Sequence, residues 1–385
     1  MSKNILIIPG SSLVNFGGTE KVTLDLIDYL SKYNLKISIF TVLYKFNFFQ
    51  KNKDIIPEFR KYQIYRVIVN SFFIPRFFYI FLSIFYYVDW LINYKILLKY
   101  LSRYNFDIII ISNLYILPSL IKAVKIFESK PKIFFWDHGT LVYFYYRKNR
   151  NIIYNLSFRY FLTKIFNYTD NYLCISRGIE RIIKEINPEA NTYLVYNPVE
   201  IPKEVKLIPR GENNVLLYVG RLEDNQKNIS FMLRGLSRLK EYKWELRVIG
   251  KGPDEGKLRK LSKELGIEER IRWEGFKRDP YEDLEEVKVL LLTSRWEGLP
   301  LVLVEGNVRG IPFLSSNCVS GPEDIVIEGV NGYLYEEGNM EDFVDKLRRI
   351  LTNELRFAEP YEVHKTSYRF EKSKILNSIT NIILG

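Results

Sequence analysis

Short apolar runs recur along the chain, and turn residues and amphipathic stretches follow them. The first run, Ile5–Ile8, precedes a glycine-containing loop and a stretch with helical spacing over 19–32. Continuous apolar runs of this length are typical of strands buried in parallel sheets, which need helical crossovers. We therefore expect strands over 4–9, 35–43, 106–112, 132–136, 171–176 and 192–196, and again over 215–219, 244–250, 271–276, 287–292 and 311–314.

A polar, proline-containing stretch over 199–214 interrupts this alternation. With 385 residues, the chain is long enough for two domains with separate cores. Alternating strands and helices on each side of the interruption indicate an α/β fold with two doubly wound, Rossmann-like parallel sheets facing a ligand cleft. We predict domains over 1–198 and 199–370 and a last helix over 371–385.

The segment after the strand over 287–292 is the most informative local pattern. Glycine and proline turn the chain there before an apolar helix begins. Pro300 suits the first turn of that helix, because its missing N–H would have no partner there. Unpaired amides and the helix dipole favour an anion such as phosphate. The predicted anion site comprises Gly298, Leu299, Pro300 and Leu301.

Two carboxylates flank this helix start. Glu297 precedes it and Glu305 lies within the helix, roughly 8 Å away at the helical rise per residue. This spacing could hold the sugar of a nucleotide-sugar at one end and the ribose at the other. Glutamates at this spacing also occur by chance in many helices.

A second group of candidate residues follows the strand over 215–219. Gly220 ends that strand, and Arg221 and Lys227 lie in the loop that leads into a helix. A guanidinium fork and an ammonium group in such a loop suit a diphosphate, although surface cations are common. Gly250 ends the next strand at the equivalent place.

Two candidates lie in the first half. His138 follows the strand over 132–136, at the end of a parallel strand where such sheets bind ligands, although a lone histidine is more often structural. Gly17 and Gly18 precede the first helix, where they allow either close approach to a phosphate or a tight turn without a ligand.

Glu297 and Glu305, with seven residues between them, resemble the E-x7-E motif of glycosyltransferase family 4, a retaining family with the two-domain GT-B fold. The segment from Gly220 through Arg221 to Lys227 resembles the family's second signature. The resemblance covers nearly all of the second half, and in the first half it rests on the glycine pair, His138 and the order of elements. Parts of the second half are most similar to enzymes that extend the lipopolysaccharide core with galactose, or to related hexosyltransferases.

The resemblance implies a role for each candidate. Glu297 would hold the sugar hydroxyls, Glu305 the ribose, and His138 the sugar near the reacting carbon. Gly17, Gly18 and Gly250 would face the donor, the second domain would bind the nucleotide-sugar, and the first would bind the acceptor. The expected reaction transfers a hexose, with retention, from a UDP-linked donor to a glycan or lipid-linked acceptor in cell-surface polysaccharide or lipopolysaccharide synthesis.

Charge is distributed unevenly between the halves. Residues 1–198 carry 26 Lys and Arg against 13 Asp and Glu, a net of +13, whereas residues 199–385 carry 30 against 32, a net of −2. The first half also contains aromatic, basic stretches over 72–104 and 151–168. The first of these suits either an anionic membrane surface or a buried core helix. The two cysteines and the absence of a secretory signal favour a cytoplasmic protein, which could lie peripherally on the inner face of the membrane.

The chain contains no Asp-x-Asp sequence, the usual metal-binding motif of transferases, so we expect neither a metal nor a cofactor. Arg221, Lys227 and helix amides would then stabilise the leaving group. Two alternatives remain open at this point. A GT-B hydrolase or epimerase could share the nucleotide site. A non-catalytic nucleic-acid-binding protein would explain the basic half, but no nucleic-acid-binding module is recognisable and no nucleic-acid partner is expected.

Overall fold

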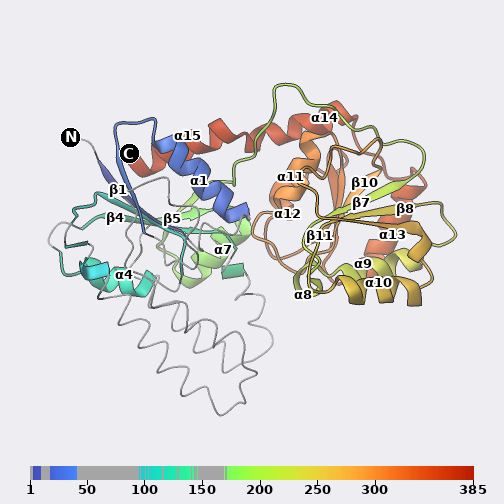
Figure 1. Ribbon diagram of the computed structural model, residues 1–385, viewed down its shortest axis with the longest axis horizontal. Helices are drawn as coiled ribbons and strands as arrows, with labels where there is room; N and C mark the ends of the chain where they lie inside the picture. The colour runs from blue at the N-terminus through green and yellow to red at the C-terminus, as the bar shows by residue number, and fades with distance from the viewer. Residues whose placement is uncertain are drawn as a thin grey trace, which may run out of the picture.

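The computed structural model describes residues 3–9, 18–40, 95, 97–99, 101, 102, 104–114, 117–127, 130–139, 141, 142, 145, 169 and 171–385. These residues form two parallel sheets, with helices packed beside each (Figure 1). The predicted α/β class with two doubly wound sheets is therefore confirmed.

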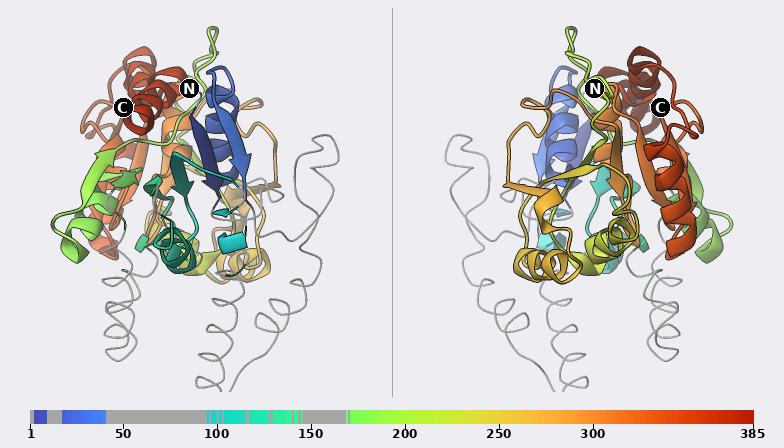
Figure 2. Two further views of the ribbon diagram at one scale, coloured as in Figure 1. Left: turned by 90° about the vertical axis from the view of Figure 1, so that its left-hand side faces the viewer. Right: turned by 90° about the vertical axis from the view of Figure 1, so that its right-hand side faces the viewer.

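The first sheet has the strand order β2-β1-β3-β4-β5-β6, and its strands are twisted relative to one another (Figure 2). Because β1 lies between β2 and β3, the direction of winding reverses there. Figure 1 shows α1 (Gly18–Leu30) on one face and α4 (Leu117–Val124) and α7 (Arg177–Ile186) on the other. The strands are β1 (Asn4–Ile8), β2 (Lys36–Ile39), β3 (Ile108–Ile111), β4 (Lys132–Asp137), β5 (Asn171–Cys174) and β6 (Asn191–Leu194).

The second sheet has the order β12-β11-β10-β7-β8-β9, so its winding reverses between β7 and β10. Ligands of open α/β sheets bind at the carboxyl ends of the strands beside such a reversal. The strands are β7 (Val215–Val219), β8 (Glu245–Ile249), β9 (Ile271–Gly275), β10 (Val289–Leu292), β11 (Phe313–Asn317) and β12 (Gly332–Glu336). The α-helices are α8 (Asp224–Lys227), α9 (Ile229–Ser237), α10 (Glu255–Glu264), α11 (Leu301–Val308), α12 (Pro322–Ile325), α13 (Met340–Leu351) and α14 (Pro360–Lys365).

The chain returns to the first sheet at its end. Helix α15 (Lys372–Leu384) packs beside α1, as Figure 1 shows. Nζ of Lys372 lies 2.8 Å from Oδ1 of Asp25 in α1 and 3.2 Å from Oε2 of Glu200. The connecting stretch is packed as well, since the amide of Val199 donates to the carbonyl of Phe370 over 2.8 Å. The two ends of the second half are thus joined to each other, and α15 is tied to α1 of the first half.

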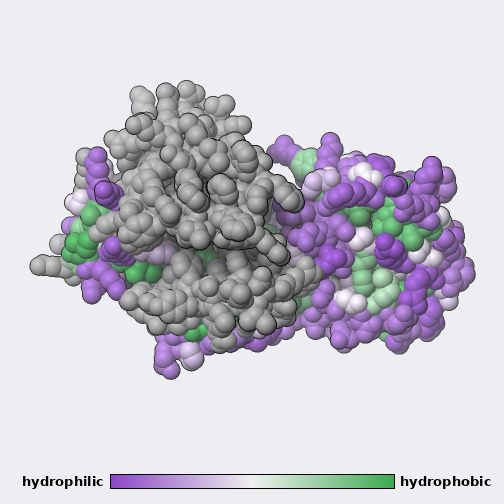
Figure 3. Space-filling view, turned by 90° about the horizontal axis from the view of Figure 1, so that it is seen from below, coloured by the Kyte–Doolittle hydropathy of each residue, from purple (hydrophilic) through white to green (hydrophobic). Residues whose placement is uncertain are grey.

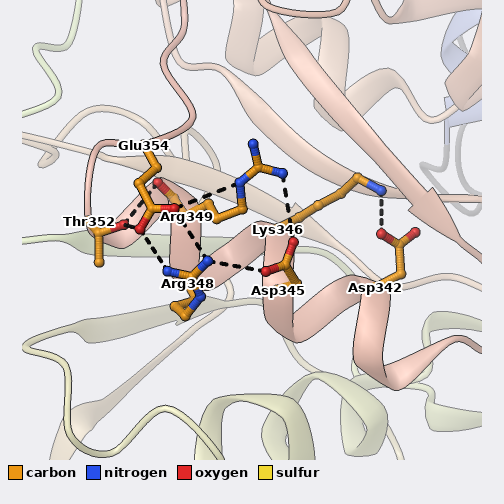
Figure 4. Close-up of polar contacts among 7 residues, drawn as sticks. All are labelled: Asp342, Asp345, Lys346, Arg348, Arg349, Thr352 and Glu354. Carbon is orange, nitrogen blue, oxygen red and sulfur yellow. Dashed lines mark hydrogen bonds and ion pairs between the residues drawn. The ribbon is translucent and has the colours of Figure 1, made fainter.

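The last turns of α13 carry a network of ion pairs (Figure 4). Arg348 contacts Asp345 at 3.2 Å and Glu354 at 2.7 Å, and Lys346 pairs with Asp342 one turn earlier. The acidic partners of Arg348 are about half exposed, at 53% and 49%. Exposed pairs contribute on the order of 0–1 kcal/mol each. The network therefore reinforces a surface helix and does not form a site.

Much of the second half's surface seen from below in Figure 3 is hydrophilic. No helix in the described part of the chain is long and apolar enough to cross a membrane. Most of the aromatic stretch 72–104, the whole of 151–168 and Gly17 lie outside the described residues. Within 72–104, Leu97 and Leu101 are described, and both are buried in the first core.

Candidate active site

The loop between β10 and α11 lies at the winding reversal of the second sheet. Helix α11 begins at Leu301, and Pro300 is its N-cap, with a non-helical ψ of 88°. The expectation that Pro300 lies in the first turn was therefore wrong by one residue, because its ψ is not helical; its ring lies against Gly321. The amides of Gly298, Leu299 and Leu301 donate to no group among the described residues. The predicted free amides are thus present, three and two residues before the helix at Gly298 and Leu299 and at its first position, Leu301.

Glu297 and Lys227 meet beside these amides. Nζ of Lys227 donates to Oε1 of Glu297 over 2.7 Å, and only 17% and 8% of the two side chains are exposed. A carboxylate this deeply buried needs a paired charge, and Lys227 supplies it. From the sequence, Lys227 was predicted to bind the diphosphate and Glu297 the sugar. The structure instead joins them directly.

Arg221 lies on the same segment as Lys227 but points elsewhere. Its Nη2 lies 2.8 Å from Oε2 of Glu223 and donates to Oε1 of Gln226 over 3.2 Å. Its side chain is 60% exposed. The guanidinium is therefore accessible to a solute approaching the end of β7.

Gly220 and Gly250 bring the ends of β7 and β8 together. Gly250 has a φ of +148°, and a Cβ there would lie 1.8 Å from the carbonyl oxygen of Gly220. Any side chain would force the two strand ends apart. Glycine at 250 is thus required for packing, which accounts for it without a ligand.

His138 reaches this region from the first half, at the end of β4. Its backbone carbonyl would lie 2.9 Å from a Cβ built on Gly298, and a Cβ on Gly139 would lie 3.2 Å from the Cα of Gly298. The two halves therefore touch along bare backbone beside Glu297. The structure brings His138, Glu297 and the free amides into one region.

The imidazole of His138 is held neutral. Burial lowers its pKa to about 4, and the neighbouring Asn197 opposes this shift only partly. Neither ring nitrogen has a hydrogen-bond partner among the described residues. Oδ1 of Asn197 is likewise buried and unsatisfied within that part of the chain. A neutral ring with an unsatisfied donor and acceptor beside Asn197 is suited to a polar, uncharged group such as a sugar hydroxyl.

Glu305 lies in the second turn of α11, and its side chain makes no hydrogen bond or ion pair with any described residue. Burial raises the pKa of its carboxyl group, Lys21 opposes the shift, and Asp279 adds to it. Because Lys21 belongs to α1, the carboxyl group of Glu305 lies within electrostatic range of that helix of the first half.

Contacts between the halves escaped sequence reasoning. Ser176, the N-cap of α7, bonds to Ser320 over 2.5 Å, and Ser320 donates to the carbonyl of Gly298 over 2.9 Å. The amide of Arg177 donates to the buried Asp324 over 3.1 Å. Burial raises the pKa of Asp324 to about 6, against the effect of that amide. Helix α7 is therefore docked onto the loop that supports Gly298.

The assembled groups can bind and stabilise a diphosphate ester. Free amides, Lys227 and Arg221 would counter its charge, while Glu297 and His138 offer partners for hydroxyl groups. Within the described part of the chain, no group of three or more His, Cys, Asp or Glu side chains could hold a metal ion.

Comparison with known proteins identifies the family. The model described as Glycosyltransferase Family 4 matches residues 16–202, and that described as Glycosyl transferases group 1 matches residues 201–368. The lipopolysaccharide 1,6-galactosyltransferase of Escherichia coli K12 is 33% identical over 294 residues, which cover 74% of this chain and 77% of the relative.

Solved structures agree with this assignment. The apo form of the lipopolysaccharide outer core galactosyltransferase WaaB superposes with a TM-score of 0.80 and 28% identity over 99% of both chains. Anabaena HepE in complex with UDP superposes with a TM-score of 0.68 over 99% of both chains, and at 14% identity it shows the fold alone. The chain therefore belongs to glycosyltransferase family 4 and is a glycosyltransferase with the GT-B fold.

Proposed function

We propose that this enzyme transfers a hexose, namely galactose, from its UDP ester to a sugar of the lipopolysaccharide core, with retention of configuration. The choice of galactose and of the acceptor is supported by the name and 33% identity of the Escherichia coli relative. The choice of UDP is supported by the UDP bound to the HepE structure, which shares the fold.

The observation that carries the proposal is the convergence of Lys227, Glu297 and three open amides at the winding reversal of the second sheet. In the reaction, the bond between the anomeric carbon and the β-phosphate oxygen breaks. The acceptor oxygen bonds to that carbon on the same face, and its proton passes to the departing phosphate. Lys227, Arg221 and the amides stabilise the charge of the released UDP.

The remaining residues orient the donor. Glu297 accepts hydrogen bonds from the sugar hydroxyls, and Glu305 accepts them from the ribose. His138, held neutral by burial, bonds the sugar near the reacting carbon without adding a charge beside it. Gly18, at the start of α1, lets the first half approach the donor closely.

The acceptor is proposed to reach the first half from an anionic membrane surface. Lys95 and Lys99, one helical turn apart, are exposed, whereas Leu97 between them is buried. A segment with this arrangement can rest on lipid headgroups while its apolar side faces the core. Together with the net charge of +13 over 1–198 (26 basic against 13 acidic residues), this favours a lipid-linked acceptor.

A transfer assay tests the proposal. The protein is incubated with UDP-galactose, UDP-glucose, UDP-N-acetylglucosamine or GDP-mannose and a truncated lipopolysaccharide core, and products are identified by mass spectrometry and NMR. We expect an α-linked galactosyl product, also in the presence of EDTA. Turnover of the donor that is independent of acceptor would instead indicate a hydrolase or epimerase. Activity abolished by EDTA and restored by Mn²⁺ would contradict the metal-independent mechanism.

A further inference from the structure

Helix α8, which carries Lys227, is a single turn of four residues, Asp224–Lys227. A helix this short is not stable on its own, because the free energy needed to nucleate it exceeds the stabilisation that one turn of hydrogen bonds provides. The carbonyls of the last turn of a helix also have no partners further along it. In α8 that last turn is the whole helix: the amide of its C-cap, Asn228, satisfies the carbonyl of Asp224, and outside groups must satisfy the other three.

All four carbonyls of α8 accept hydrogen bonds from the loop after β10. The donors are the guanidinium and amide of Arg295 and the hydroxyl of Thr293. Nη1 of Arg295 donates to Asp224 over 2.5 Å and to Asn225 over 2.9 Å, its amide donates to Gln226 over 2.8 Å, and Oγ1 of Thr293 donates to Lys227 over 2.9 Å.

Side chains at the end of α8 also form hydrogen bonds with the loop after β10. Nε2 of Gln226 donates to the carbonyl of Trp296 over 3.2 Å, and Nη2 of Arg295 donates to Oδ1 of Asn228, which ends α8 in the left-handed conformation. Arg295 stands two residues before Glu297, the partner of Lys227. These contacts therefore set the position of Lys227 relative to Glu297.

We propose that Arg295 is a positioning residue for donor binding, which acts by holding α8 so that Lys227 presents its ammonium group to the diphosphate. Arg295 itself does not touch the donor: its guanidinium is engaged by α8. The inference rests on the proposed function, because it takes Lys227 as a diphosphate ligand.

The test compares variants of the full-length protein by UDP affinity, by kcat/KM for the donor and by thermal stability. Arg295→Ala should weaken UDP binding and lower kcat/KM about tenfold or more, since hydrogen bonds from a charged group are lost. Arg295→Lys keeps the charge but lacks the guanidinium fork, so its UDP affinity should lie between those of the wild type and Arg295→Ala. Arg270→Ala is the matched control, because Arg270 donates to the carbonyls of Tyr242 and Lys240 at 2.8 Å each, also in the second half. It should lose stability but keep UDP affinity.

A double-mutant cycle with Lys227→Ala decides the route of the effect. If Arg295 acts through Lys227, Lys227→Ala/Arg295→Ala should bind UDP as Lys227→Ala alone does. The inference would be overturned if the losses of UDP affinity in the two single variants were additive. It would also be overturned if Arg295→Ala bound UDP as tightly as Arg270→Ala does, provided that Lys227→Ala alone still weakens UDP binding. If Lys227→Ala keeps wild-type affinity, the proposed donor site is wrong and the inference is overturned with it.

Discussion

Nζ of Lys227 lies 2.7 Å from Oε1 of Glu297, although the two residues are 70 positions apart in the chain. Each was expected to hold a different part of the donor, and here they hold each other. A diphosphate that accepts hydrogen bonds from the ammonium group of Lys227 would share this donor with Glu297. Binding of the phosphates and orientation of the carboxylate toward the sugar are therefore coupled.

The first prediction concerns this pair. Lys227→Met should destabilise the fold by about 3 kcal/mol, because it leaves a buried carboxylate without its partner. The double variant Lys227→Met/Glu297→Gln should regain most of that stability, since the charge is also removed. Both should lose turnover about 100-fold, as should Arg221→Ala with little loss of stability. Urea unfolding at pH 7 and turnover measurements check this, and a double variant no more stable than Lys227→Met would contradict it.

The second prediction separates the two glutamates. Glu305→Gln should weaken the binding of UDP itself, because a ribose hydroxyl loses its charged acceptor. Glu297→Gln should not weaken UDP binding, because it leaves Lys227 available to the diphosphate, and should remove the additional affinity that the sugar confers. Calorimetric titration with UDP and with UDP-galactose measures both effects. Equal losses of UDP affinity in the two variants would show that the assigned roles are wrong.

The third prediction concerns pH. The pKa of His138 is lowered from 6.5 to about 4 in the folded protein, so between these values only the unfolded state gains the proton. Stability should therefore fall as pH drops through this window, by about 2 kcal/mol between pH 7 and pH 5. His138→Gln should lack this loss.

The wild type alone cannot test this. The carboxyl group of Asp324 has a pKa raised from 3.8 to about 6, so the folded state gains its proton first and stability rises as pH falls through that window. The two groups oppose each other between pH 6 and pH 4. The informative quantity is the difference between His138→Gln and wild type in denaturant unfolding at pH 7 and pH 5. Equal pH dependence in both proteins would disprove the assignment.

The fourth prediction concerns the membrane. The protein should sediment with anionic vesicles at low salt and be released as salt rises, because screening shortens to about 8 Å at physiological ionic strength and each basic residue contributes about 1 kcal/mol. Replacing Arg76, Lys95, Lys99 and Arg103 with Gln should weaken sedimentation without changing UDP affinity.

The matched control removes as many charges from the second half. Lys240, Lys257, Lys260 and Lys263 are exposed there, and their replacement with Gln should leave sedimentation unchanged. Arg76 and Arg103 lie outside the described residues, so Lys95 and Lys99 are also replaced alone. If the wild-type protein does not sediment with anionic vesicles, this would favour a core helix over 72–104 and a soluble acceptor.

Strands and the main site were predictable because each depends on a local signal. Buried parallel strands are continuous apolar runs, and the loop before α11 is marked by glycine and proline. Helix α8 was not predicted, because a single turn has no periodicity and its carbonyl partners are Thr293 and Arg295, far along the chain. The pairing of Lys227 with Glu297 and the contact of Ser176 with Ser320 likewise depend on tertiary distance, which spacing alone does not reveal.

Gly139 and Gly298 meet without side chains where the two halves touch. The closest approach of the halves is therefore set by contact between the two backbones. A methyl group at Gly298 would already clash with the carbonyl oxygen of His138. The separation of the halves at this point cannot be reduced by exchanging side chains, because neither glycine has one. A change of ligand preference would have to come from residues around this contact, while the separation of the two backbones at Gly298 stays the same.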